Sequence, residues 1–152
     1  MGEVEINNRK ASHSYQILST VEAGIELKGT EVKSLRAGHG NLSDAFARVE
    51  KGGQVWLYQF DISPYSHGNQ ENHEPKRTRR LLLNKVEIRK LYTESSVAGR
   101  TLVPLKGYFK HNIFKILLGI GIGKNVRDKR QDLIRRDTER AVRRGMANRR
   151  KS

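Results

Sequence analysis

The chain has 152 residues and a formal net charge of +14 at pH 7, and it contains no cysteine. The lack of cysteine excludes disulfide frameworks, thiolate zinc sites and cysteine nucleophiles. The first ten residues lack the apolar core of a signal peptide, and the longest apolar run, 116–122, is far too short to cross a bilayer. We therefore expect a cytoplasmic protein with one compact domain and a polyanionic partner, with nucleic acid as the first candidate.

The first half of the chain predicts short strands, tight turns and one helix. The polar segment 7–12 is expected to be an arm, and 51–53 is expected to be a hairpin turn. A helix is expected over 31–37, with Thr30 as its cap and Gly38 as its end. Apolar patterning predicts four strands in this half, with the first two forming a hairpin: 15–21, 24–28, 42–50 and 54–62.

The second half continues the same mixture after a long polar loop at 63–76. A helix is expected from 85 to about 97, with Asn84 as its cap and Gly99 as its end. Strand segments are expected on either side of a turn at 111–112, and they cover 101–105, 107–110 and 113–122. These elements predict a mainly β protein whose antiparallel strands form a small closed or nearly closed barrel with flanking helices.

The last thirty residues carry more than half of the charge excess. Segment 123–152 holds twelve Lys or Arg and four Asp or Glu, a net charge of +8, and it has too few large apolar residues for a core of its own. We therefore predict a domain over 1–122 and a basic tail over 123–152. The hypothesis is that the tail is disordered when free and becomes helical against RNA, and the alternative is a solvated, charge-laced helix on the domain surface.

No motif in the chain points to catalysis, a cofactor or a metal. The glycine-rich segment 119–124 is not a phosphate-binding loop, because its glycine spacing is wrong and Asn125 replaces the Ser or Thr that would hold magnesium. The five histidines do not show metal-ligand spacing, and no nucleophile elbow or dinucleotide fingerprint is present. We therefore expect no enzymatic activity, no cofactor and no metal site.

Two further features of the body suit RNA. Basic residues gather at 76–80, where a solvated loop is the alternative, and Asn8, Lys10 and His13 form a second, weaker patch. Trp56, Tyr58 and Phe60 alternate along one strand and share one face. We interpret that aromatic face as buried core, and a base-stacking platform is the alternative.

Segment 29–38, GTEVKSLRAG, closely resembles a hallmark of the bacterial SsrA-binding protein family, also called small protein B. Further matches to that family follow the same order along nearly the whole chain, at 8–11 with His13 and Tyr15, 22–24, 41–44, 62–65, 77–84, 102–105 and 128–130. The resemblance implies an antiparallel barrel of the oligonucleotide-binding (OB) type. It also implies binding to transfer-messenger RNA (tmRNA), and delivery of that RNA to ribosomes stalled on messages without a stop codon.

The resemblance further implies a division of work within the chain. The body grips the tRNA-like domain of tmRNA, and the tail enters the decoding centre and message channel of the small ribosomal subunit. Elongation factor Tu and alanyl-tRNA synthetase handle the same RNA, and no membrane is involved. A structural ribosomal protein or a general RNA-binding barrel remains the alternative, because the composition fits both.

By position, the resemblance implies tmRNA binding by Asn8, Glu22 and Leu82. For Leu82, a place in the core is the alternative. Basic residues of the matching segments complete the predicted tmRNA-binding set: Lys10, His13, Lys33, Arg36, Arg77 and Arg79. The predicted ribosome-binding residues of the tail are Gly123, Lys124, Arg127, Asp128, Lys129 and Arg130. The chain departs from the family at Asn125, usually lysine, and at Arg127, usually aromatic or histidine.

Overall fold

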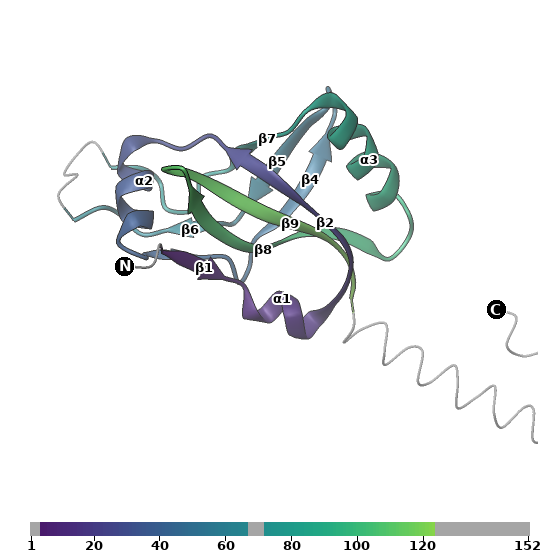
Figure 1. The fold of residues 1–152 in the computed structure, drawn as a ribbon, viewed down its shortest axis with the longest axis horizontal. Coiled ribbons are helices and arrows are strands. Elements are labelled where there is room, and N and C mark those ends of the chain that lie inside the picture. The colour runs from purple at the N-terminus through teal and green to yellow at the C-terminus, as the bar shows by residue number, and fades with distance from the viewer. Residues whose placement is uncertain (1–3, 67–71, 124–152) are drawn as a thin grey trace, which may run out of the picture.

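The computed structural model describes residues 4–66 and 72–123, and the rest of the chain lies outside this description. Figure 1 shows the arrangement of the helices and strands. In chain order they are β1 (Glu5–Asn7), α1 (Arg9–Ser14), β2 (Tyr15–Ile25), α2 (Gly29–Arg36), β3 (Gly40–Asn41), β4 (Phe46–Glu50), β5 (Gln54–Tyr58), β6 (Asp61–Ile62), β7 (Arg79–Leu82), α3 (Lys85–Ser95), β8 (Arg100–Lys110) and β9 (Ile113–Gly123).

Seven strands form one antiparallel sheet in the order β1–β8–β4–β5–β7–β2–β9. Strand β9 also pairs with β8 over the whole length of their hairpin, so the sheet closes into a ring. Strands β3 and β6 form a separate two-stranded sheet. Together with the three helices of the described residues, this ring confirms the predicted mainly β antiparallel barrel.

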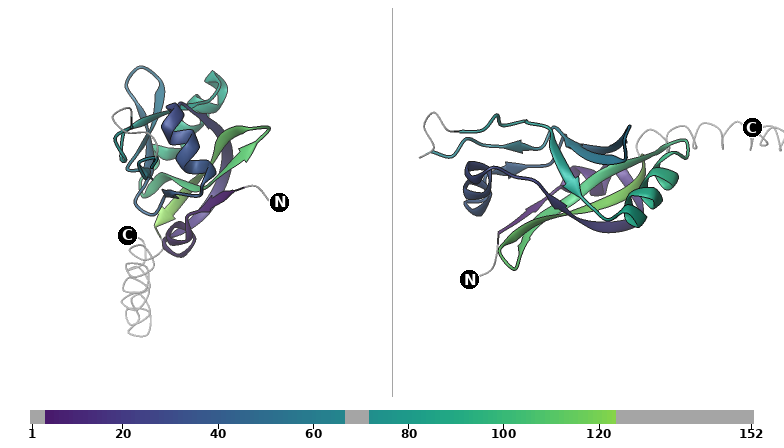
Figure 2. Two further views of the ribbon diagram at one scale, coloured as in Figure 1. Left: turned by 90° about the vertical axis from the view of Figure 1, so that its left-hand side faces the viewer. Right: turned by 90° about the horizontal axis from the view of Figure 1, so that it is seen from above.

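The helices lie at different edges of the barrel. Helix α2 lies across one end, where the left view of Figure 2 looks along the barrel. Helix α1 lies at the bottom, and α3 at the top, of both Figure 1 and that view. Residues on α1 and residues on β7, the strand that leads into α3, therefore belong to different parts of the surface.

Alternate residues of β5 define which side of the barrel wall is core. Val55 and Leu57 are fully buried, whereas Trp56 and Tyr58 are only partly buried. The aromatic face of this strand is therefore the outer one, and the prediction that it forms the core is wrong for these two residues. Phe60 is nevertheless fully buried, because a positive φ of 63° at Gln59 breaks the alternation after Tyr58.

Strand β2 is longer than expected. The predicted hairpin of 15–21 and 24–28 does not form, because Tyr15–Ile25 is one continuous strand that pairs with β9 and, at its end, with β7. Its register shifts between Ile17 and Ser19, so the strand bends within the sheet instead of turning back. Gly24 lies inside this strand and forms no turn.

Two segments have more structure than the sequence predicts. The expected arm contains β1 and the short helix α1, which begins where the Asn8 side chain accepts a hydrogen bond from the Ala11 amide at 3.1 Å. The basic segment before α3 contains strand β7, whose Arg79 and Leu81 point inward. The predicted Asn84 cap of α3 and the turn at His111–Asn112 are confirmed, and both turn residues have positive φ.

Candidate nucleic-acid interface

Sheet register brings Glu22 and Leu82, which are far apart in the sequence, onto one outward face. Gly24 pairs with Leu82 on β7 and with Lys115 on β9, and Lys115 pairs in turn with Tyr108 on β8. Directly paired residues project to the same side of a sheet, and so do residues two apart on one strand. Glu22 therefore shares the face of this row, which we call the Glu22 face.

Gly24 has no side chain, so it leaves the backbone uncovered at the centre of the Glu22 face. A Cβ atom at this position would lie 3.3 Å from the Leu82 Cβ, a tight contact. Leu82 itself is 44% exposed, so the alternative of a core leucine is wrong. A partly exposed leucine beside a bare stretch of backbone can pack against a flat group such as a base or a sugar.

Glu22 is held as an ionised acceptor. The Tyr108 hydroxyl donates to Glu22 Oε2 at 2.5 Å, and Lys110 Nζ lies 3.5 Å from Oε1. The hydrogen bond from Tyr108 lowers the pKa of Glu22, and the charges of Lys110 and Lys115 lower it further. Burial, together with the bond to Glu22, raises the pKa of Tyr108 to about 12. The carboxylate is therefore charged at neutral pH and fixed in direction.

This geometry suits recognition of donors on RNA. A carboxylate accepts hydrogen bonds from base amino groups and from 2′-hydroxyl groups, and the neighbouring lysines can offset its repulsion of phosphates. Sequence reasoning missed Tyr108, Lys110 and Lys115 as members of the face. The available signal was their positions on the two arms of the β8–β9 hairpin, but their approach to Glu22 depends on the pairing of β9 with β2.

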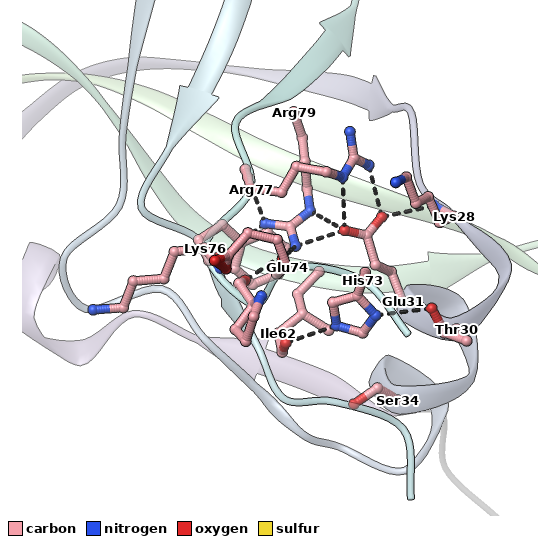
Figure 3. Close-up of polar contacts among 12 residues, drawn as sticks. Lys28, Thr30, Glu31, Ser34, Ile62, His73, Glu74, Lys76, Arg77 and Arg79 are labelled. Carbon is pink, nitrogen blue, oxygen red and sulfur yellow. Dashed lines mark hydrogen bonds and ion pairs between the residues drawn. The ribbon is translucent and has the colours of Figure 1, made fainter. Parts of the chain in front are cut away.

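A second cluster of charges, which we call the Glu31 network, lies inside the barrel end (Figure 3). Arg79 is fully buried, and its Nε and Nη2 lie 2.7 and 2.6 Å from Glu31 Oε2. Arg77 approaches the same carboxylate from outside, with Nη2 2.8 Å from Oε1. Burial raises the pKa of Glu31, but hydrogen bonds from Arg77, from the Lys28 amide and from Arg79 outweigh it and lower that pKa to about 2.

The Glu31 network revises the predicted role of Arg79. Its side chain has no exposed surface, and its Nη2 also donates to the Pro75 carbonyl at 3.1 Å. It therefore has no route to a phosphate in this fold, and it connects β7 to the loop and to α2. Arg77 retains 27% of its side-chain exposure, but it is engaged by Glu31 in the same way.

His73 completes the attachment of the polar loop to α2. Its Nε2 lies 2.8 Å from the Ile62 carbonyl oxygen and its Nδ1 lies 2.9 Å from Thr30 Oγ1. A carbonyl oxygen can only accept, so Nε2 carries the proton, and in the neutral ring Nδ1 accepts from the Thr30 hydroxyl. Ser34 Oγ also donates to the Ser63 carbonyl at 2.7 Å. These contacts hold the polar loop against α2.

Asn8 supports α1 from inside. It is 5% exposed, and its Nδ2 donates to the carbonyls of Leu42 at 3.0 Å and Pro104 at 2.8 Å. With its Oδ1 engaged in the helix cap, its hydrogen-bonding groups already have partners, so it positions the helix and does not face a ligand. Lys10 and His13, in contrast, lie on the exposed side of α1, and Lys10 Nζ is 3.3 Å from Asp44.

The predicted residues of α2 form a third exposed group. Lys33 Nζ lies 5.6 Å from the ring centre of Tyr65, and the Arg36 guanidinium lies 4.3 Å from that of Phe109. Both side chains are exposed. Of the predicted tail residues, Gly123 pairs with Tyr15 at the end of β9. The others lie outside the described residues: Lys124, Arg127, Asp128, Lys129 and Arg130.

The described residues meet the requirements of neither a metal site nor a membrane-spanning helix. Within residues 4–66 and 72–123, histidine and carboxylate side chains form no group of three or more that could hold a metal ion. None of the helices in that same part of the chain has the length and apolar character needed to cross a membrane.

A family model described as SmpB protein matches residues 5–148. The chain belongs to the SmpB protein family. Two similar proteins are named SsrA-binding protein. The one from Carboxydothermus hydrogenoformans is 54% identical over 142 residues, covering 93% of this chain and 95% of the relative. The one from Geobacillus sp. strain WCH70 is 51% identical over 150 residues, covering 99% and 96%.

A solved structure gives the same result for the fold. A chain in the structure described as "tmRNA-SmpB: a journey to the center of the bacterial ribosome" is 49% identical to this one and has a TM-score of 0.68. The match covers 79% of this chain and 84% of that chain. These comparisons confirm the resemblance to the SmpB family, whereas the roles of single residues remain predictions.

Proposed function

We propose that this protein binds the tRNA-like domain of tmRNA and delivers it to stalled ribosomes for trans-translation. The observation that carries the proposal is the match along nearly the whole chain to the SmpB family, together with the similarity to the structure described as "tmRNA-SmpB: a journey to the center of the bacterial ribosome". The basic composition supports it, because RNA phosphates are the partners that a charge of +14 favours.

The Glu22 face is the proposed site of recognition on the body. Glu22 accepts from base amino groups or 2′-hydroxyls, Leu82 packs against a base or sugar, and Lys110 and Lys115 contact phosphates. The exposed residues Lys10, His13, Lys33 and Arg36 provide further contacts at other edges. Arg77 contributes only its remaining exposed surface, and Asn8 and Arg79 act by holding the fold.

The proposal divides the chain at the end of β9. Residues 1–122 form the tmRNA-binding barrel, and 123–152 form a tail that is disordered when free and helical on the ribosome. The composition of the tail, +8 in thirty residues, supports an rRNA partner in the decoding centre and message channel. The protein is an adaptor without catalytic activity that works in the cytoplasm, where elongation factor Tu and alanyl-tRNA synthetase act on the same RNA.

A pair of charge reversals in the tail tests this division. Lys129→Glu combined with Arg130→Glu is expected to leave tmRNA affinity within about twofold and to abolish peptide tagging on stalled ribosomes, because the body binds the RNA and the tail engages the ribosome. Filter binding and a reconstituted tagging assay measure the two activities separately. A loss of tmRNA affinity as severe as the loss of tagging would contradict the division.

Competition between RNAs tests the function itself. Labelled tmRNA bound to the protein is challenged with unlabelled tmRNA, ordinary tRNA or unstructured RNA at one fixed salt concentration, since affinity for RNA depends strongly on salt. We expect tmRNA to compete at least about tenfold better than either control, which corresponds to about 1.4 kcal/mol. Equal competition would instead favour a general RNA-binding or ribosomal protein.

A further inference from the structure

A groove opens beside the Glu22 face, between the β4–β5 turn, strand β7 and helix α3. Its volume is about 650 Å³, within the range of roughly 300–1,000 Å³ typical of sites that enclose a ligand. Leu82 forms part of its lining, so the groove is continuous with the Glu22 face. Figure 1 shows the β4–β5 turn and the start of α3 close together at the top of the molecule.

The groove combines an apolar surface with cationic walls. Leu82 and Ile88 provide apolar surface, and Arg80, Lys85 and Arg89 provide positive charge. Lys85 and Arg89 are four residues apart on α3, and therefore on the same side of the helix. Both are exposed, and neither forms an ion pair with any residue that the structure describes.

Arg80 is only partly satisfied by its protein partners. Its Nη2 lies 2.7 Å from Glu26 Oε2, and its Nη1 donates to Gln54 at 3.3 Å. Its Nε is buried and has no hydrogen-bond partner among the described residues. A ligand at this wall can therefore meet only the part of the Arg80 side chain that stays exposed, which is 35%, and not the buried Nε.

The opposite wall of the groove includes two consecutive glycines, which have no side chains. Gly52 and Gly53 form the β4–β5 turn, with φ values of 91° and 81°, and a Cβ at either would meet open space. This bare turn leaves room on that side of the groove. Other residues would be strained at both positions, so the turn geometry itself favours the open wall.

We propose that this groove receives an unpaired nucleotide of the RNA bound at the Glu22 face. The base packs against Leu82 and Ile88, and the flanking phosphates contact Lys85 and Arg89, with Arg80 at the wall next to Leu82. A nucleotide matches this lining because it joins a flat, largely apolar ring to anionic phosphates. The inference rests on the proposed function and adds the class of RNA element that this part of the surface takes.

Site-specific crosslinking tests the contact directly. The sequence has no cysteine, so a single introduced thiol can carry an aryl azide. Gln54→Cys places the probe in the groove, and Thr93→Cys places it on the exposed surface of α3 outside the groove. With tmRNA bound, we expect at least about fivefold more crosslinked RNA from Gln54→Cys. A yield equal to or below that of Thr93→Cys would overturn the proposal.

Salt dependence provides a second test with a matched pair of variants. Arg89→Gln and Lys90→Gln each remove one exposed charge from neighbouring positions of α3, but only Arg89 lines the groove. Each lost phosphate contact reduces the slope of log affinity against log salt concentration by about 0.7 for a single strand. We expect that change in slope for Arg89→Gln and no change for Lys90→Gln. Identical slopes for the two variants would overturn the proposal that the groove binds a nucleotide.

The RNA competition assay, run beside these two tests, distinguishes failure of this inference from failure of the proposed function. If wild-type protein shows no preference for tmRNA over tRNA, the proposed function fails and the groove inference fails with it. If the preference is present while the Gln54→Cys and Arg89→Gln results match their controls, only the groove inference is overturned.

Discussion

The Glu22 face and the Glu31 network both place a carboxylate among basic groups, yet their surroundings give them different roles. The Glu22 side chain keeps 34% of its exposure and has lysine and tyrosine neighbours on the outer face of the sheet. The Glu31 side chain has none and is enclosed by two guanidinium groups. A partly exposed acceptor can exchange its partners for RNA, whereas a buried one is committed to the fold. Burial therefore separates recognition from support in this protein.

The largest effect is expected from a substitution that breaks the Glu31 network. Glu31→Gln leaves the buried Arg79 guanidinium without its counter-charge, and removal of one partner from a buried pair costs about 3–5 kcal/mol. We expect the free energy of unfolding in urea to fall by that amount. Glu22→Gln is the control, and it should change stability by less than about 1 kcal/mol because its ion pair is partly exposed. Equal losses would contradict the comparison.

Acid should weaken the Glu31 network over a defined pH range. The pKa of Glu31 is about 2 in the folded protein against an ordinary 4.5. A carboxyl group with a lowered folded-state pKa contributes stability above its unfolded pKa, and that contribution is lost as pH falls towards the folded value. We expect a loss on the order of 3 kcal/mol between about pH 4.5 and pH 2. Urea unfolding across this range should show a shallower decline for Glu31→Gln.

A smaller effect is expected when the Glu22 carboxylate loses its hydrogen bond from Tyr108. Tyr108→Phe removes the hydrogen bond that directs it, so the pKa of Glu22 should rise towards its ordinary value and tmRNA affinity should fall about two- to tenfold. Tyr58→Phe is a matched control, because Tyr58 donates to Glu50 in the same way elsewhere on the barrel. NMR titration and filter binding measure the two quantities. Equal losses of affinity in the two variants would remove Tyr108 from the site.

The sequence predicted correctly those features that depend only on neighbouring residues, such as a helix cap and a turn. The Asn84 cap of α3 and the turn at His111–Asn112 depend on residues next to each other, and both are confirmed. The predicted hairpin of 15–21 and 24–28 is wrong, because Gly24 lies within one continuous strand and pairs with two other strands. Such pairing depends on segments far along the chain.

In the candidate site, too, the sequence indicated single residues but not the contacts between residues far apart in the chain. The residues Glu22 and Leu82 were selected from family resemblance, but their common face follows only from the register of β2 with β7. Arg79 was predicted to contact RNA because it belongs to the basic run 76–80 and to a segment that matches the family. Its burial depends on Glu31, which lies 48 residues earlier in the chain. A basic run alone does not reveal which of its members has an internal partner.

The most direct test of the account compares tmRNA with tRNA in competition binding to wild-type and Glu22→Gln protein at one salt concentration. The account predicts that wild type prefers tmRNA and that Glu22→Gln, while still folded, loses about tenfold or more of its tmRNA affinity and most of that preference, since the amide weakens a charged acceptor. A Glu22→Gln protein with undiminished preference for tmRNA would show that recognition lies elsewhere.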